Sequence, residues 1–445
     1  MNYPVAFPFA SSVISPFEID FQNQDEAFVP TIVHRMMACG AKLVLSLSAG
    51  KDSDVMLRKV MAAAKKYGWQ KDQIICVFAE LGRIEWLGVQ EHLNVLCKEF
   101  DLSLLVVRRK KGGMIERWRE RFEKIASEGN DKPFWSSALA RYCTDQLKNV
   151  PIDQALRLIN SWVKQGIVPA KVGDKPFFSS SASRYCTKEL KIQVIDQDAL
   201  RSFDLVICGI GIRAEESPKR SQKPFYQVRS AITTAALKEP KLEKPEQKEA
   251  WADDSFDRWL LGNRKGRFAI DWHPVLHFKL EDVWRGLGTS SEDVDRRRDL
   301  FRMGWFAEAL KGFQGHWGYI AESSRLSCSQ CVLASLNDLK VGALFNPLVW
   351  LELALLELES GWSFKNNWWL STLRNHVRQH TQSFRNKLLK VLYDMGLVDR
   401  FAPGFSLAVM TMIPAEISMY WTDEFFAEIT SDRWWAEADE ESDDA

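Results

Sequence analysis

The chain has 445 residues, of which 46% are apolar and 27% charged, and its 59 basic residues balance its 59 acidic residues. This composition is that of a soluble globular protein long enough for two or three domains, and it excludes a strong net field that would attract nucleic acid. The N-terminal segment lacks the features of a signal peptide, and no apolar run reaches the ~18 residues that span a bilayer. We therefore expect a cytoplasmic protein without a membrane partner.

The first half of the chain alternates short apolar runs with segments of helical periodicity. Helices are predicted over 52–67 and 84–100. Strands that alternate with helices predict an α/β fold with a doubly wound, mostly parallel sheet. Ligands of such sheets bind at the carboxyl ends of the strands. The predicted strands are 42–48, 73–79, 102–108 and 203–210.

Three further segments describe the domain organisation. Residues 132–148 are echoed by 175–191, and both copies contain Arg-Tyr-Cys-Thr. Two copies are too few for a solenoid, so the repeat is interpreted as a local duplication inside an α/β domain of residues 1–235. The segment 236–256 is rich in Lys, Glu and Pro and is predicted to be a charged linker. The remainder, 257–445, is predicted to be mostly helical, with one helix that starts at Asn346-Pro347 and ends at Gly361.

The loop Ser48-Ala49-Gly50-Lys51-Asp52-Ser53 joins the first predicted strand to its helix. Small residues allow the backbone to fold closely around an anion, and the start of a helix presents unpaired N–H groups. Lys51 adds a mobile positive charge and Ser53 a hydroxyl donor. The spacing differs from the Walker loop and matches SxGxDS, a pyrophosphate loop. The alternative is a Gly-containing turn that Asp52 or Ser53 caps.

Three more motifs follow this loop in the chain: AELGRIEW at 79–86, GIGIRAEESPKR at 209–220, and WHP at 272–274 followed by EDVW at 281–284. Together with the loop they resemble the phosphoadenosine phosphosulfate reductase family, within the superfamily of adenine nucleotide alpha hydrolase-like ATP pyrophosphatases. FNP at 345–347 and ESGWSF at 359–364 are similar to the sulfurtransferase-like branch. The resemblance implies that the chain binds ATP or an adenylyl nucleotide together with Mg²⁺.

The resemblance also identifies candidate ligand-binding residues. Arg213 follows the strand 203–210, where a guanidinium could bind phosphate, or could instead pair with Glu215 or Glu216. Glu80 ends the second strand and could bind ribose hydroxyls or Mg²⁺, or could simply be solvated. The complete set of candidate nucleotide-binding residues is Ser46, Ser48, Ala49, Gly50, Lys51, Asp52, Ser53, Glu80, Gly82, Gly211 and Arg213. The candidates for an oxyanion pocket are Arg141, Lys148, Arg184, Lys191 and Arg220, against the alternative of solvated helix faces.

The cysteines suggest a metal site. Cys328 and Cys331 form a CxxC, which in a reducing compartment indicates metal or redox chemistry more than a disulfide. An iron–sulfur cluster or a zinc site generally needs four ligands, and Cys143 and Cys186 in the repeat could complete the set. The alternatives are a reactive thiol and inert buried cysteines.

The reaction is inferred from two departures from the reductase pattern. Reductases of this family have lost the Lys-Asp of the loop and use a cysteine near the C-terminus, whereas here Lys51-Asp52 is intact and no cysteine follows Cys331. We therefore expect cleavage of the α–β phosphate bond, with Lys51, Asp52 and Arg213 as catalytic residues, for adenylylation that serves sulfur transfer. The alternatives are thiol-dependent reduction by Cys328 or Cys331, and a non-catalytic nucleotide-binding subunit of a DNA-modification or phage-defence complex. The corresponding partners are a small-molecule nucleotide, a protein complex or a nucleic-acid substrate.

Overall fold

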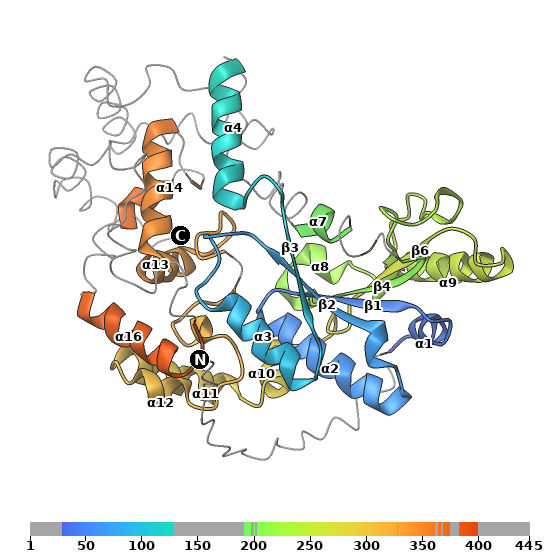
Figure 1. The fold of residues 1–445 in the computed structure, drawn as a ribbon, viewed down its shortest axis with the longest axis horizontal. Coiled ribbons are helices and arrows are strands. Elements are labelled where there is room, and N and C mark those ends of the chain that lie inside the picture. Colours follow the sequence, from blue (N-terminus) through green and yellow to red (C-terminus); the bar gives the residue numbers. More distant parts are fainter. Residues whose placement is uncertain are drawn as a thin grey trace, which may run out of the picture.

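The computed structural model describes residues 29–128, 191–196, 200, 203–326, 328–360, 364–365, 368–373 and 382–398. At its centre lies a six-stranded sheet with the strand order β3-β2-β1-β4-β6-β5 (Figure 1). All neighbouring strands run parallel except β5, which is antiparallel to β6. This arrangement confirms the predicted α/β fold. The strands are β1 (Lys42–Leu47), β2 (Ile74–Glu80), β3 (Leu104–Arg108), β4 (Leu205–Ile210), β5 (Tyr226–Val228) and β6 (Phe268–Trp272).

Both faces of the central strands are buried, which explains why their sequences are almost continuously apolar. One face, which includes Leu43 and Leu45, belongs to the main hydrophobic core. The opposite face, which includes Val44 and Val206, packs against a smaller cluster around the short helix α7 (Gln193–Ile195). Up to residue 261, the helices that contribute to the main core are α1 (Thr31–Ala38), α2 (Lys51–Tyr67), α3 (Val89–Glu99) and α9 (Pro245–Leu261).

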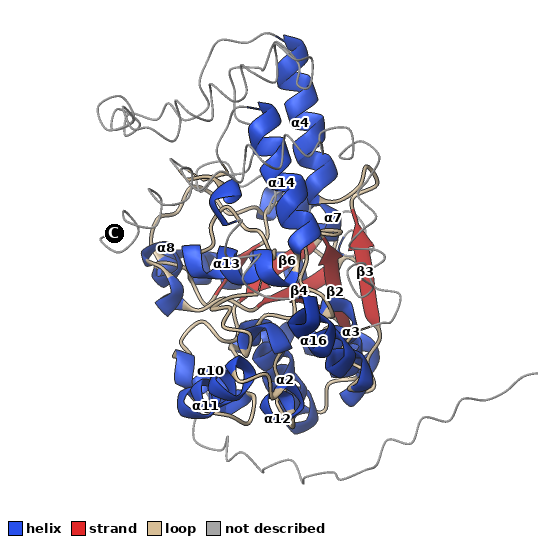
Figure 2. Cartoon of the chain, turned by 90° about the vertical axis from the view of Figure 1, so that its left-hand side faces the viewer, coloured by secondary structure: helices blue, strands red, loops and turns tan. Residues whose placement is uncertain are grey.

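The later helices divide between the two sides of the sheet, as Figure 2 shows. The helices α10 (Leu280–Gly286), α11 (Ser291–Arg302), α12 (Phe306–Leu310) and α16 (Gln382–Asp394) extend the main core. On the other side, α4 (Met114–Glu128), α13 (Leu336–Phe345) and α14 (Pro347–Ser360) build a second core, and α8 (Pro218–Ser221) follows β4. Helix α14 begins at the proline that the sequence predicts. Within the described residues, no helix has both the length and the apolar character needed to cross a bilayer.

The charged segment 236–256 is not a linker, which corrects the sequence prediction. Most of it forms the first part of α9, whose residues Ala252 and Phe256 are fully buried. Five of its eight Lys and Glu residues are exposed, and a composition count does not distinguish this exposed side from the packed one. The strand β6, which follows this segment, pairs with β4. Residues beyond 257 therefore complete the same sheet, and the predicted boundary does not separate the sheet from the C-terminal region.

The strand order reverses beside β1, and this reversal positions the site. From β1 the chain moves outward through β2 to β3, then returns so that β4 pairs with the other edge of β1. The loops after β1 and β4 therefore leave the sheet side by side. In open α/β sheets a crevice forms at such a switch point, at the carboxyl ends of the strands.

Candidate active site

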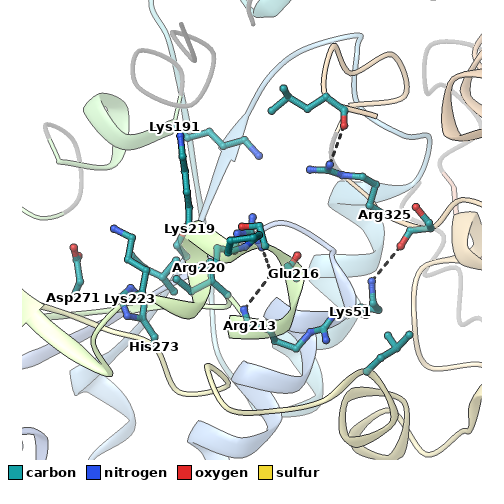
Figure 3. A pocket seen from close by; sticks show the side chains of 18 of the residues that line it. Lys51, Lys191, Arg213, Glu216, Lys219, Arg220, Lys223, Asp271, His273 and Arg325 are labelled. Carbon is teal, nitrogen blue, oxygen red and sulfur yellow. Dashed lines mark hydrogen bonds and ion pairs between the residues drawn. The ribbon is translucent and has the colours of Figure 1, made fainter. Parts of the chain in front are cut away.

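A cleft of about 1750 Å³ lies at this switch point (Figure 3). It is larger than the ~300–1,000 Å³ usual for small-molecule pockets, so it has room for a nucleotide and a second group. The structure brings five predicted residues from distant parts of the sequence to its lining: Ser46, Lys51, Lys191, Arg213 and Arg220.

The loop after β1 is folded tightly on itself. Ala49 has a left-handed backbone with φ of 53°, and Gly50 precedes the first residue of α2. The Ser53 hydroxyl donates to the Gly50 carbonyl at 2.8 Å and accepts the Ser48 N–H at 3.2 Å. The predicted Ser53 donor is thus used inside the loop, where it fixes the shape of the backbone.

Lys51 is the first residue of α2 and is only 7% exposed. Its Nζ donates to the Ser324 carbonyl at 3.2 Å and lies 4.9 Å from the centre of the Tyr319 ring. Its backbone N–H donates to the Tyr319 hydroxyl at 2.8 Å. Burial lowers the pKa of Lys51, and the neighbouring Asp52 carboxylate opposes this change. The lysine is therefore held at the cleft by a segment that lies 268 to 273 residues further along the chain.

Arg213 follows β4 and is 4% exposed. Its Nε donates to Asp52, and its Nη1 donates to Glu215 at 2.6 Å. Its backbone N–H also donates to the Glu216 carboxylate at 3.1 Å. The pairing that the sequence offered as the alternative is thus present, while Arg213 still lines the cleft. Its guanidinium links the loop after β1 to the loop after β4 and orients Asp52.

Gly211 explains how the two loops approach so closely. A Cβ atom at this position would lie 2.9 Å from both the Cα and the backbone nitrogen of Ser53. These are backbone atoms at the start of α2, and they cannot move aside without moving the helix. A residue without a side chain is therefore needed where the two loops meet.

Glu80 and Gly82 lie at the end of β2, outside the lining of the cleft. The Glu80 carboxylate forms an ion pair with Arg108 on β3 at 3.0 Å, and Gly82 has a left-handed backbone with φ of 81°. The structure gives Glu80 a partner within the sheet. A role for either residue in binding ribose or Mg²⁺ stays a prediction.

The lining of the cleft is strongly basic. Such an excess of one charge in a concave site attracts anions. Figure 3 shows Lys191, Lys219 and Lys223 on the side of the cleft away from Lys51. Lys219 and Lys223 are exposed. The basic lining residues are Lys51, Lys191, Arg213, Lys219, Arg220, Lys223, Arg229, Arg298 and Arg325, against the acidic residues Glu216, Asp271 and Asp295.

The cysteine site can be followed only in part. Cys328 and Cys331 are partly buried against the second core, and the backbone of Cys328 pairs with that of Glu85. In the part of the chain that is described, no group of three or more His, Cys, Asp or Glu side chains could hold a metal ion. Cys143 and Cys186 lie outside the described residues, so the four-cysteine site stays a prediction. The oxyanion candidates Arg141, Lys148 and Arg184 also lie outside them.

Several residues of the cleft were missed by the sequence interpretation. Trp284 and Lys219 lie inside the quoted motifs, so their position there was the available signal. Tyr319 and Ser324 lie in no motif, and they reach Lys51 only through the folding of the C-terminal region. No sequence pattern could have found them.

A parallel sheet with a strand–loop–helix turn at its switch point defines an α/β protein of the nucleotide-binding type. A family model, the phosphoadenosine phosphosulfate reductase domain, matches residues 42–295. This match covers more than half of the chain, and the chain belongs to that family. The match indicates an enzyme of this nucleotide-binding family. No curated protein matches the chain.

Proposed function

We propose that the protein binds ATP, or another adenylyl nucleotide, in this cleft and cleaves the bond between its α- and β-phosphates. Pyrophosphate would leave and the adenylyl group would pass to an acceptor. The observation that carries the proposal is the meeting of an intact Lys51-Asp52 loop with Arg213 at the switch point. Ligands of this fold class bind at this place, and the charges there suit a triphosphate.

The chemistry requires stabilisation of the negative charge that develops on the leaving pyrophosphate. Fixed positive groups do this best, because they need no rearrangement during the reaction. Lys51 would supply an ammonium that Ser324 and Tyr319 already hold in place. The start of α2 adds the partial positive charge of a helix N-terminus. Arg213 would keep Asp52 oriented beside the phosphates.

The residues present are compatible with Mg²⁺. This ion prefers oxygen ligands, and it is usually held by one or two carboxylates together with substrate phosphates. The Asp52 carboxylate, 13% exposed beside the loop, is a donor of this kind. Asp52 would help to hold the ion, and a bound ion would neutralise charge on the phosphates.

The cysteines would connect this reaction to sulfur transfer, in keeping with the sulfurtransferase-like motifs. Cys328 and Cys331 provide two of the four thiols that a cluster generally needs. The residues proposed for α–β bond cleavage do not include these thiols. The adenylylation step can therefore be tested separately from any cluster.

The test is pyrophosphate release from ATP by the purified chain. Lys51→Ala and Asp52→Ala should each lower release at least ~10²-fold, which is typical for loss of one transition-state contact. Lys265→Ala, an exposed lysine on the turn before β6, is the matched control and should be unchanged. Release that survives in both loop variants would refute the proposal. Sulfite release with thioredoxin would favour the reductase, and tight ATP binding without turnover would favour a non-catalytic subunit.

A further inference from the structure

The segment that holds Lys51 lies outside the family match, which ends at residue 295. Two of its residues contact this lysine. Tyr319 accepts the backbone N–H, and the Ser324 carbonyl accepts the ammonium. A carbonyl is a neutral acceptor, so it directs the ammonium without cancelling the charge. The position of Lys51 therefore depends on what fixes the carbonyl of Ser324.

The turn that contains Ser324 is fixed by one buried carboxylate, that of Asp338. Asp338 is 4% exposed. Its Oδ1 accepts the Ser324 N–H at 2.7 Å and shares the proton of the Ser323 hydroxyl, at 3.3 Å, with the Arg325 carbonyl at 2.7 Å. Its Oδ2 accepts the Ser324 hydroxyl at 2.8 Å. Three hydrogen bonds from two consecutive residues leave the turn little freedom, and bonds to an ionised carboxylate are stronger than neutral ones.

Asp338 is itself anchored in a rigid element. It lies in the first turn of α13, where it forms a capping box with Ser335. The next residue, Leu339, is fully buried in the second core, as is Ala343 one turn later. The carboxylate thus connects the second core to the Ser324 turn, and this turn connects to Lys51.

We propose that Asp338 is a positioning residue for Lys51, acting through the Ser323–Arg325 turn and not by contact with the nucleotide. This inference rests on the proposed function, because it assigns Lys51 to the phosphates. It adds that α13, which lies beyond the matched domain and packs into the second core, completes the site. Helix capping is the competing explanation for Asp338, and it predicts no special effect on Lys51.

A double-mutant cycle on ATP binding separates the two explanations. Asp338→Asn should weaken ATP binding about tenfold in the chain that keeps Lys51 and less than about twofold in the Lys51→Ala chain. If Asp338 acts through Lys51, removing Lys51 also removes most of the effect of Asp338 on ATP binding. Calorimetry on the full chain measures the dissociation constants. Ser335→Ala is the control for helix capping, since it removes the cap of α13 and the Ser335 hydroxyl bond to Asp338 but leaves the Asp338 bonds to Ser324. Equal weakening in both Lys51 backgrounds, or by Ser335→Ala, would overturn the proposal.

A second measurement needs no nucleotide. Acetic anhydride acylates accessible lysines, and mass spectrometry compares Lys51 with the exposed Lys265 of the same chain. We expect Lys51 to react slowly in the native chain and several times faster in Asp338→Asn, with Ser335→Ala unchanged. Should Asp338→Asn not fold, Ser324→Ala removes one of the three bonds and should give the same change, but smaller. Unchanged Lys51 reactivity would contradict the positioning role. If Lys51 reacts faster in Asp338→Asn but the native chain binds no ATP, the positioning role of Asp338 is upheld and the proposed function is rejected.

Discussion

The two sides of the cleft hold their positive charges differently. On the side of α2, Lys51 and Arg213 are at most 7% exposed and have fixed partners. On the side of α8, Lys219 and Lys223 are exposed. Their side chains form no ion pair or hydrogen bond with other described residues.

This difference separates two tasks of a cationic site. Charges that stabilise a transition state work best when the protein has already oriented them, which agrees with the buried side. Charges that only attract and retain an anion can stay on flexible, solvated side chains, which agrees with the exposed side. We therefore expect changes on the buried side to affect stability and turnover together, and changes on the exposed side to affect binding alone.

The largest effect is expected for Arg213→Ala. The substitution leaves the Asp52 carboxylate without its guanidinium partner in a site where it is only 13% exposed. Removing one partner of a buried ion pair lowers the unfolding free energy by about 3–5 kcal/mol. Urea unfolding followed by tryptophan fluorescence should show a clearly lower midpoint, and pyrophosphate release should be lost.

The double variant Arg213→Ala/Asp52→Asn is the control for this prediction. Removing both charges should restore much of the stability, although not the activity. A single variant as stable as the native chain would show that the pair is solvated and that the buried side is not preorganised.

Gly211→Ala should have the next largest effect. It should lower the unfolding free energy by about 1–3 kcal/mol, which is usual when an extra carbon atom is forced into a packed site. The new Cβ would meet backbone atoms of Ser53, so the start of α2 must shift. ATP binding, measured by calorimetry, should weaken with it.

Gly209→Ala is the matched control, since its Cβ would meet the side chain of Leu45 inside the sheet. It should lower stability but leave ATP binding near the native value. Equal loss of ATP binding in both variants would mean that the loop contact at Gly211 has no special role.

Much of the fold could be predicted from the sequence, because long apolar runs bounded by loops define parallel strands. The strands 42–48 and 203–210 were placed within two residues of β1 and β4. The strands β5 and β6 were missed, since β5 has three residues and β6 contains an aspartate. The α9 error arose because the packed side of a helix is hidden by the charges on its other side.

The sequence predicted only those site residues that lie in a short motif directly after a strand. The loop and Arg213 were found because each directly follows a strand, and the sheet places such loops together. Their mutual pairing, and the role of the Ser324 turn, depend on contacts over more than 150 residues. Periodicity and motif spacing carry no information about such contacts.

Glu85 should make the unfolding free energy depend on pH. Burial raises the pKa of Glu85 to about 8, against the opposing effect of Lys191. The folded state then keeps a proton that the unfolded chain releases. The stabilisation is complete below the ordinary pKa near 4.5 and is lost as pH rises toward about 8. The slope should reach at most about 1.4 kcal/mol per pH unit, for one proton.

Urea midpoints across this pH window test the prediction with Glu85→Gln. The variant cannot ionise, so its curve should be flatter and its stability at pH near 8 higher than that of the native chain. The matched control is Glu308→Gln, at an exposed carboxylate on α12. A native curve without this slope would contradict the raised pKa of Glu85.

The smallest change in stability is expected for Lys219→Ala combined with Lys223→Ala. Substitutions of exposed side chains usually alter the unfolding free energy by less than about 0.5 kcal/mol. ATP binding should nevertheless weaken several-fold at low salt, because two charges near the anion are lost. This difference should shrink at high salt, since exposed charges are screened over a Debye length of about 10 Å at 0.1 M.

The control is Lys241→Ala combined with Lys265→Ala, at exposed lysines outside the cleft lining. This pair changes the net charge by the same amount and should leave ATP binding unaltered. If the control pair weakens ATP binding as much as the cleft pair, the attraction comes from the net charge of the protein and the α8 side has no specific role.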